Sequence, residues 1–426
     1  MQQVIIDIVN NYYDPISKQQ GAMPLDRFLQ LALSEESLGY YKIKDPFSSI
    51  NSTSLSFTSL DPNLITPLGV KNNLQGDFIT SPETSQIFGE LIGVWLLDTW
   101  QTMGCPSAFN LIELGGGTGR LMQDVLRVIN KLSAIAAKAL KIYIIDINPL
   151  LIKQQAINLK DFSHIYWHLS IEAMLKDKTY LASPTFIISN EFFDALPIKQ
   201  YVYLDNCFYE NLVYFNPKIQ QLQLKHSLIA TNFASQGKTL EAPLDKLLKQ
   251  FFSYQSSYQE SKEITPPILE FSPKAHAIYQ QLLNIIKIQT GAILTIDYGP
   301  FKPTFKSSLR GFKTHRLLDT RQLLQQIGEA DITANVNFFC LQELAKANKT
   351  NTFAIQTQRQ FLEGMGIYSR IATLMNNALT ENDKKSIQEA ADLLINKADM
   401  GEVFKVVAVA SPCLNALATF TPLIES

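Results

Sequence analysis

Residues 110–119 read Asn-Leu-Ile-Glu-Leu-Gly-Gly-Gly-Thr-Gly, an apolar run that ends in glycines. The run predicts a short strand over 110–114, and the pattern over 119–139 predicts a helix directly after it. Gly115, Gly117 and Gly119 stand at the turn between them, where bare backbone can approach a ligand at the positive end of the helix. The stretch therefore indicates a strand–turn–helix unit that binds a ligand; the alternative is a glycine-rich turn with no ligand.

The spacing of these glycines indicates which ligand fits. The dinucleotide fingerprint G-x-G-x-x-G requires a glycine at its sixth position, which is Arg120 when counted from Gly115. The spacing G-x-G-x-G, with Glu113 before it, suits S-adenosyl-L-methionine better. That ligand has no pyrophosphate and brings an amino-acid end, a sulfonium cation and an adenosine. S-adenosyl-L-methionine is therefore favoured over a nicotinamide dinucleotide.

An acidic residue ends the next predicted strand, which spans 142–146. Asp146 follows Gly119 by 27 residues, and a carboxylate at this place can accept both hydroxyl protons of a ribose. An aspartate at a strand end can instead cap the following helix, and Pro149 fits that alternative. Taken together with the glycine turn, the position of Asp146 favours ribose binding.

Strands and helices continue to alternate beyond this unit. Further strands are expected over 164–167, 185–189, 292–297 and 404–410, and a helix is expected over 273–289. Such alternation is typical of a mostly parallel sheet with helices on both faces. The sequence accordingly predicts an N-terminal helical segment with a Ser-rich loop (1–75), the first part of the core (76–204), an inserted α/β cap (205–270) and the remainder of the core (271–426).

The run Ser189-Asn-Glu-Phe-Phe-Asp-Ala-Leu-Pro197 leaves the fourth predicted strand. Ligands of open α/β sheets bind beyond the carboxyl ends of the strands, so Asn190, Glu191 and Asp194 are expected beside the reacting group. A guanidinium or amine nucleophile needs a carboxylate to orient it and to disperse its positive charge. The alternative is that Asn190 caps the following turn and Glu191 is solvated.

Composition and charge exclude several classes of protein. The 426 residues include 37 Lys and Arg against 39 Asp and Glu, so no basic field attracts nucleic acid. The four cysteines lie far apart without neighbouring histidine pairs, which predicts neither disulfides nor a metal site. The most apolar stretch, Leu91 to Trp100, is far shorter than the ~20 residues of a membrane span, and the N-terminus lacks the basic region of a secretory signal. We expect a cytoplasmic protein; the sequence leaves its oligomeric state open.

Further motifs follow one another through the chain. They are GDFITSPE (76–83), FGE (88–90), the glycine turn, NEFFDALP (190–197), AILTIDYG (292–299), SLRGFKTHR (308–316), ADITANVNF (330–338), the TQ…FL…GI stretch (357–367) and MGEVFKVVAV (400–409). In this order they resemble the MidA-like family of class I methyltransferases, which includes the mitochondrial complex I assembly arginine methyltransferase. The resemblance covers about 350 residues, from Gly76 to the C-terminus.

This resemblance implies a Rossmann-like methyltransferase core that uses S-adenosyl-L-methionine. It implies that the cofactor is held by Glu113, by the three glycines, by Asp146 and Asn190, and, over its methionine end, by Thr80, Ser81, Pro82 and Glu83. It also implies a transfer site lined by Asn190, Glu191 and Asp194, with Asp297 and Tyr298 at the fifth strand. His315 is either a proton acceptor or a structural hydrogen-bonding residue of a substrate loop.

The function predicted from the sequence is methyl transfer to a protein side chain, and the resemblance implies that this side chain is an arginine of a respiratory complex I subunit. One departure favours an alternative: the family commonly has a histidine and an aspartate where this chain has Asn335 and Asn337. The chain would then be an assembly chaperone that binds S-adenosyl-L-methionine without turnover. A third alternative is a nicotinamide-dependent oxidoreductase on the same kind of sheet.

Overall fold

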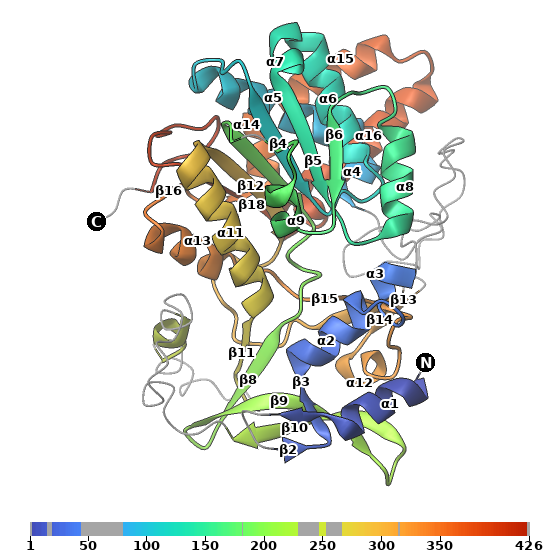
Figure 1. The fold of residues 1–426 in the computed structure, drawn as a ribbon. Helices are drawn as coiled ribbons and strands as arrows, with labels where there is room; N and C mark the ends of the chain where they lie inside the picture. The colour runs from blue at the N-terminus through green and yellow to red at the C-terminus, as the bar shows by residue number, and fades with distance from the viewer. Residues whose placement is uncertain are drawn as a thin grey trace. The chain divides into compact units, whose positions relative to one another are not determined.

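The computed structural model of the protein describes residues 2–14, 19–43, 80–180, 182–228, 247–252, 266–313 and 316–423 (Figure 1). The chain divides into two compact units. Unit 1 comprises Met1–Ile43, Phe193–Gln280 and Pro300–Asn348, and unit 2 comprises Lys44–Phe192, Gln281–Gly299 and Lys349–Ser426. The four segments predicted from the sequence follow chain order, whereas each unit is assembled from three separate stretches. The Ser-rich loop predicted over 48–75 lies outside the described residues.

Unit 2 is built on one sheet. Its strands are β4 (Phe109–Leu114), β5 (Leu140–Ile145), β6 (Ile165–His168), β7 (Thr185–Asn190), β12 (Gly291–Tyr298), β16 (Asn351–Thr352), β17 (Gln356–Thr357) and β18 (Phe404–Ala410). They follow the order β16-β18-β12-β7-β4-β5-β6, with β17 also paired to β18. The strands from β12 to β6 run parallel, and β18 runs antiparallel to β12. This confirms the predicted mostly parallel α/β core.

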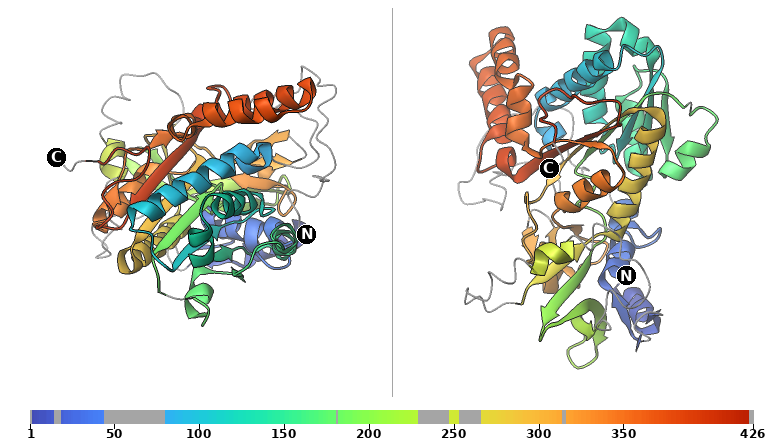
Figure 2. Two further views of the ribbon diagram at one scale, coloured as in Figure 1. Left: turned by 90° about the horizontal axis from the view of Figure 1, so that it is seen from above. Right: turned by 90° about the vertical axis from the view of Figure 1, so that its left-hand side faces the viewer.

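The helices of unit 2 lie on both sides of this sheet (Figure 2). They are α4 (Ser81–Thr84), α5 (Gln86–Thr102), α6 (Arg120–Leu132), α7 (Ala134–Ala139), α8 (Pro149–Asn158), α9 (Ile171–Lys176), α14 (Gln358–Gly364), α15 (Ile367–Asn377), α16 (Glu381–Ile395), α17 (Met400–Val403) and the second half of α11 (Pro273–Gln289). Alternate strand residues such as Leu111 and Ile188 pack in one core with α5, α6 and α14 to α16. Their neighbours Ile112 and Ile187 are buried as well, as expected for a sheet covered on both faces.

The order of the strands makes the position next to β4 the topological switch point of the sheet. β5 and β6 follow β4 on one side, whereas β7 and β12 lie on its other side, so the direction of the strand order reverses at β4. In open α/β sheets the ligand binds at such a point, beyond the carboxyl ends of the strands. The glycine turn leaves β4 at this edge, which is where the sequence predicted a ligand.

Local capping explains where the predicted helix over 119–139 differs from the structure. The helix is broken into α6 and α7 at Ser133, whose hydroxyl accepts a hydrogen bond from the Ala136 N–H at 3.1 Å. A serine in this position begins a new helix because it satisfies an N–H group that has no partner within the helix. The predicted helix over 273–289 and the predicted strand over 404–410 are confirmed at both ends.

The described residues of unit 1 form three antiparallel sheets. One has the order β10-β9-β8-β11, with β3 also paired to β9, a second has the order β14-β13-β15, and the third is the pair β1-β2. The strands are β3 (Ala22–Pro24), β8 (Lys199–Leu204), β9 (Cys207–Asn216), β10 (Gln221–Leu228), β11 (Ile268–Phe271), β13 (Arg310–Lys313), β14 (Arg316–Leu318) and β15 (Asp331–Thr333), and β1 (Tyr13–Asp14) pairs with β2 (Gln19–Gln20). Asp205 and Asn206 join β8 to β9 as a two-residue turn with φ of 46° and 60°, the backbone that such tight hairpins require.

The helices of unit 1 pack on these sheets. They are α1 (Gln2–Asn11), α2 (Leu25–Ser34), α3 (Tyr40–Ile43), α12 (Thr320–Leu323), α13 (Phe338–Ala347) and the first half of α11. Ile5, Phe28 and Val213 are fully buried together, so the N-terminal helices share a core with β9. None of the helices in the described ranges combines the length and apolar character that crossing a bilayer requires.

Candidate cofactor site

The glycine turn has a backbone that only glycine adopts without strain. Gly115, Gly117 and Gly119 have φ of 67°, 51° and 86°, all in the left-handed region. At Gly116 the constraint is space, because a Cβ atom there would lie 2.9 Å from Nε2 of Gln155. Gly119 also begins α6, so the turn ends at the positive end of a helix of 13 residues. These features give a cradle of backbone that can lie close to a ligand.

Two carboxylates flank the turn. Glu113 is 2% exposed, and its Oε2 atom has no hydrogen-bond partner among the described residues. Burial, together with the nearby charge of Asp146, raises the pKa of Glu113 well above its usual value. A buried acceptor without a partner is costly in the absence of a ligand, so Glu113 fits a role in holding one.

The structure decides between the two interpretations of Asp146. The side chain of Asn148 caps α8 by accepting hydrogen bonds from the N–H groups of Leu150 and Leu151. Asp146 instead lies directly after β5, where its Oδ1 accepts from the Asn148 N–H at 2.9 Å and its Oδ2 accepts from Gln155 Nε2 at 2.8 Å. The helix-cap alternative is therefore wrong for Asp146, whose carboxylate instead faces the glycine turn at the backbone N–H of Gly116.

Replacing Glu113 by glutamine is expected to stabilise unit 2 while weakening the binding of S-adenosyl-L-methionine. The folded protein holds the Glu113 proton more tightly than the unfolded chain does. The free energy of unfolding therefore falls as the pH rises from the ordinary glutamate pKa to the raised one, and the loss persists at neutral pH. Glutamine removes that loss, for a gain of about 1 kcal/mol.

This prediction is measured by urea unfolding between pH 5 and pH 8. All three tryptophans, Trp95, Trp100 and Trp167, belong to unit 2, so their fluorescence reports its unfolding. Titration calorimetry with S-adenosyl-L-methionine measures the loss of affinity, and Glu389→Gln in α16, where the side chain is 40% exposed, is the control. A Glu113→Gln variant less stable than the wild type at neutral pH would contradict the argument.

Asn190 and Glu191 form a polar group at the end of β7. Glu191 Oε1 accepts from Asn190 Nδ2 at 3.1 Å and from the Ser81 N–H at 3.2 Å. Glu191 also has a φ of 51°, a backbone strain that persists in proteins mainly where function requires it. Phe192 follows, and its ring would lie 3.0 Å from a Cβ atom at Gly115. The end of β7 therefore lies against the glycine turn, as the sequence predicted for Asn190 and Glu191.

The segment from Thr80 to Glu83 is tied to the same place. Glu83 accepts a hydrogen bond from the Thr118 hydroxyl within the glycine turn. The Ser81 hydroxyl, which is fully buried, donates to Gln358 Oε1 at 3.2 Å. Thr80 begins α4, and Pro82 is buried within it. The structure thus brings the four predicted residues 80–83 to the edge of the sheet where the glycine turn lies.

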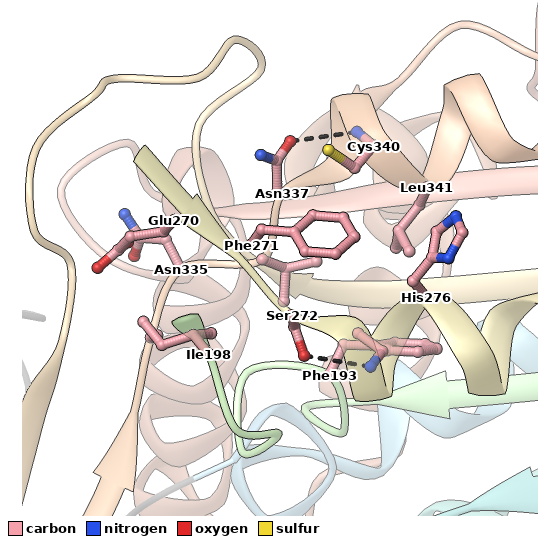
Figure 3. A pocket seen from close by; sticks show the side chains of 13 residues that line it. Phe193, Ile198, Glu270, Phe271, Ser272, His276, Asn335, Asn337, Cys340 and Leu341 are labelled. Atoms are coloured by element: carbon pink, nitrogen blue, oxygen red, sulfur yellow. Dashed lines mark hydrogen bonds between the residues drawn. The ribbon is translucent and has the colours of Figure 1, made fainter. Parts of the chain in front are cut away.

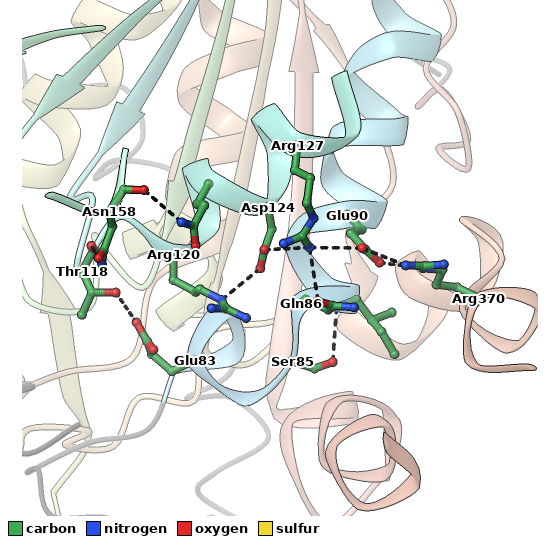
Figure 4. Close-up of polar contacts among 12 residues, drawn as sticks. Glu83, Ser85, Gln86, Glu90, Thr118, Arg120, Asp124, Arg127, Asn158 and Arg370 are labelled. Atoms are coloured by element: carbon green, nitrogen blue, oxygen red, sulfur yellow. Dashed lines mark hydrogen bonds and ion pairs between the residues drawn. The ribbon is translucent and has the colours of Figure 1, made fainter. Parts of the chain in front are cut away.

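A network of ion pairs supports the helices behind the turn (Figure 4). Arg370 donates to both oxygens of Glu90, at 2.7 and 2.9 Å, and Arg127 contacts Glu90 at 3.1 Å and Asp124 at 2.9 Å. Arg120 lies 3.3 Å from the other oxygen of Asp124, whose pKa is raised by burial to about 6 despite these two arginines. The network joins α5, α6 and α15. Arg120, the residue that departs from the dinucleotide fingerprint, thus contributes to an ion pair.

Other residues that the sequence predicted for the transfer site lie in unit 1, in β12 or outside the described residues. Asp194 belongs to unit 1, where its Oδ2 accepts from the Thr333 hydroxyl at 2.8 Å, so its catalytic role stays a prediction. His315 lies outside the described residues. Asp297 and Tyr298 are the last residues of β12, and both are buried.

Asn335 and Asn337 line a cavity within unit 1 (Figure 3). Asn337 caps α13, because its Oδ1 accepts from the Cys340 N–H at 3.1 Å. Asparagine and aspartate cap helices about equally well, so the departure from the family's aspartate leaves this function intact. Asn335 accepts a hydrogen bond from Arg310. Both side chains therefore have structural roles that do not depend on a proton-accepting group.

The sequence analysis missed Gln155 and Thr118. Thr118 was part of the quoted turn, but its hydrogen bond to Glu83 depends on the fold. Gln155 lies six residues after Pro149, and its full burial has no signal in the sequence. Within the described ranges, no group of three or more His, Cys, Asp and Glu side chains is arranged to hold a metal ion.

Comparison with known proteins shows which family the chain resembles. A family model described as "Putative S-adenosyl-L-methionine-dependent methyltransferase" matches residues 91–356. "Protein arginine methyltransferase NDUFAF7, mitochondrial" of Danio rerio is 33% identical over 80% of this chain and 78% of the relative. The protein of the same name from Mus musculus is 31% identical over 92% of this chain and 82% of the relative.

A solved structure shows the same fold. A Burkholderia thailandensis protein, crystallised with S-adenosyl-homocysteine, superposes with a TM-score of 0.72 at 18% identity, covering 98% of this chain and 94% of its own. The family match makes the oxidoreductase alternative wrong and confirms S-adenosyl-L-methionine as the cofactor. The chain thus belongs to this family of S-adenosyl-L-methionine-dependent methyltransferases.

Proposed function

We propose that this methyltransferase acts on an arginine side chain of a protein, and that the protein is a subunit of respiratory complex I. The observation that carries the proposal is Glu191, a carboxylate fixed in a strained backbone against the glycine turn. The names of the curated relatives support arginine as the acceptor. The complex I subunit and the cytoplasmic location rest on the sequence analysis and stay predictions.

The proposed cofactor contacts involve buried polar atoms that have no hydrogen-bond partner among the described residues. Glu113 Oε2 and Asn190 Oδ1 are buried acceptors that have no hydrogen-bond partner among the described residues. Asp146 is held in place by hydrogen bonds from the Asn148 N–H and Gln155 Nε2, and its carboxylate would accept from the two ribose hydroxyls. We assign the cofactor site to these three residues together with the glycine turn and the segment Thr80–Glu83.

S-adenosyl-L-methionine supplies an electrophilic methyl group on a positively charged sulfur. In the proposed transfer a guanidinium nitrogen would form the new N–C bond as the S–C bond breaks. S-adenosyl-homocysteine would leave with the electron pair of the S–C bond, and the nitrogen would lose one proton to water. The Glu191 carboxylate holds that nitrogen in line by accepting its hydrogen bonds, which reduces the entropy cost of alignment. It also stabilises the positive charge that remains on the guanidinium group.

Methyl transfer from radiolabelled S-adenosyl-L-methionine into a lysate of cells lacking this protein tests the proposal. The wild type is expected to label a discrete protein band, and acid hydrolysis of that band is expected to release methylated arginine. Gly117→Val is the control, because a β-branched residue is a severe outlier at a φ of 51° and the turn cannot keep its shape.

Each other outcome of this experiment has a defined meaning. A label on lysine or another residue would overturn arginine as the acceptor. No band, with cofactor binding shown separately by calorimetry, would favour the assembly-chaperone alternative. No band and no binding would show that the glycine turn does not hold the cofactor.

A further inference from the structure

Gln155 in α8 is a buried carboxamide whose partners all lie at or behind the cofactor site. Its side chain is fully buried. Its Nε2 donates to Asp146 Oδ2 at 2.8 Å and to the Gly117 carbonyl oxygen at 2.9 Å, and its Oε1 accepts from Trp167 Nε1 at 3.0 Å. Both N–H groups and the carbonyl are therefore engaged, which is what allows a carboxamide to be buried at all.

The glycine turn packs closely against Gln155. A Cβ atom at Gly116 would lie 2.9 Å from Gln155 Nε2, and a Cβ atom at Gly119 would lie 3.2 Å from Gln155 Cα. A leucine at position 155 would fill a similar volume and spare the protein the desolvation of a polar group. The presence of glutamine is explained by the two groups that its amide nitrogen orients.

We propose that Gln155 is a positioning residue that makes Asp146 selective for ribose. The Asn148 N–H and the Gln155 amide each occupy one lone pair on a different oxygen of the carboxylate, which fixes its plane. The backbone N–H groups of Ile147 and Gly116 also face this carboxylate, and the ribose presents two hydroxyl donors that its oxygens would accept. The same amide holds the Gly117 carbonyl, so the turn and the carboxylate keep one relative geometry. This inference rests on the proposed assignment of Asp146 to the ribose.

Asn158 provides a matched control within the same helix. It lies three residues after Gln155, and its Nδ2 donates to the Thr118 carbonyl oxygen at 2.9 Å. It is thus another carboxamide of α8 that supports the glycine turn, but it has no hydrogen bond to Asp146. A loss seen in Gln155→Leu and absent in Asn158→Leu therefore reports the orientation of Asp146.

The experiment measures the Kd of S-adenosyl-homocysteine and of its 2′-deoxyribose analogue by calorimetry on the full chain. A hydrogen bond to a carboxylate predicts that the wild type binds the analogue about 10- to 100-fold more weakly. In Gln155→Leu the ratio of the two Kd values is expected to fall below about threefold, while Asn158→Leu keeps the wild-type ratio. The transfer rate of Gln155→Leu is expected to approach that of the wild type at saturating S-adenosyl-L-methionine, because the effect is on KM.

Two further variants keep the proposal testable if Gln155→Leu does not fold. Gln155→Glu retains an acceptor for Trp167 but loses both donors, so it is also expected to lose the preference for ribose. Trp167→Phe removes the contact that anchors Gln155 and is expected to reduce the ratio in part. A wild-type ratio in the Gln155 variants, or an equal loss in Asn158→Leu, would overturn the positioning role. Equal binding of both ligands by the wild type would instead overturn the assignment of Asp146, and with it this inference.

Discussion

Glu191→Gln is expected to slow methyl transfer by about 10²- to 10³-fold while changing the Kd of S-adenosyl-L-methionine less than about threefold. The substitution keeps the length of the side chain and removes the negative charge that would orient and stabilise a guanidinium group. Glutamine is strained at a φ of 51° as glutamate is, so the folded structure is retained. Initial rates of label incorporation at saturating S-adenosyl-L-methionine, with calorimetry for binding, measure the two effects separately.

Glu83→Gln provides the contrasting case. Glu83 contacts the glycine turn by accepting a hydrogen bond from the Thr118 hydroxyl, and burial raises the pKa of Glu83. We expect this variant to raise the Kd for S-adenosyl-L-methionine more than it lowers the rate at saturation. If Glu191→Gln lowered affinity and rate together, Glu191 would be a cofactor ligand and its assignment to the acceptor arginine would be wrong.

Gly291→Ala is expected to destabilise unit 2 by about 3–5 kcal/mol. Gly291 begins β12 opposite Thr185 of β7, and its φ is 148°, a backbone that residues with a side chain rarely adopt. A Cβ atom there would lie 1.8 Å from the Thr185 carbonyl oxygen, so β7 and β12 would have to separate at this point. Urea unfolding followed by tryptophan fluorescence measures the change.

Gly104→Ala separates the cost of backbone strain from the cost of the steric clash with a neighbouring strand. Gly104 has a φ of 82°, but a Cβ atom there would meet nothing within 4 Å. Its replacement is expected to cost about 1 kcal/mol, from backbone strain alone. Equal losses in the two variants would show that the close approach of β7 and β12 contributes nothing, contrary to the geometry.

The sequence predicted the elements whose signals are local. The strand before Gly115, the helix after the glycine turn and the strand that leads to Asp146 were all expected, because apolar runs and glycines specify them within a few residues. The mostly parallel sheet followed from the alternation of strands and helices. The methyltransferase family followed from the order of several motifs, and the comparisons confirm it.

Contacts between distant residues could be determined only by the tertiary structure. Ser81 meets Gln358 across 277 residues of chain, and Glu191 meets the Ser81 N–H across 110. The requirement for glycine at position 291 arises from the carbonyl of Thr185 on a neighbouring strand, which no local pattern indicates.

The sequence by itself determined the cofactor class and the glycine turn at the carboxyl end of β4, since backbone conformation and helix ends are encoded by neighbouring residues. The tertiary structure decided that Asn148 rather than Asp146 caps α8, and that Gln155 donates a hydrogen bond to Asp146. The physical reason is that hydrogen bonds and close packing depend on distances of a few tenths of an ångström, and the fold alone sets those distances between residues far apart in the chain.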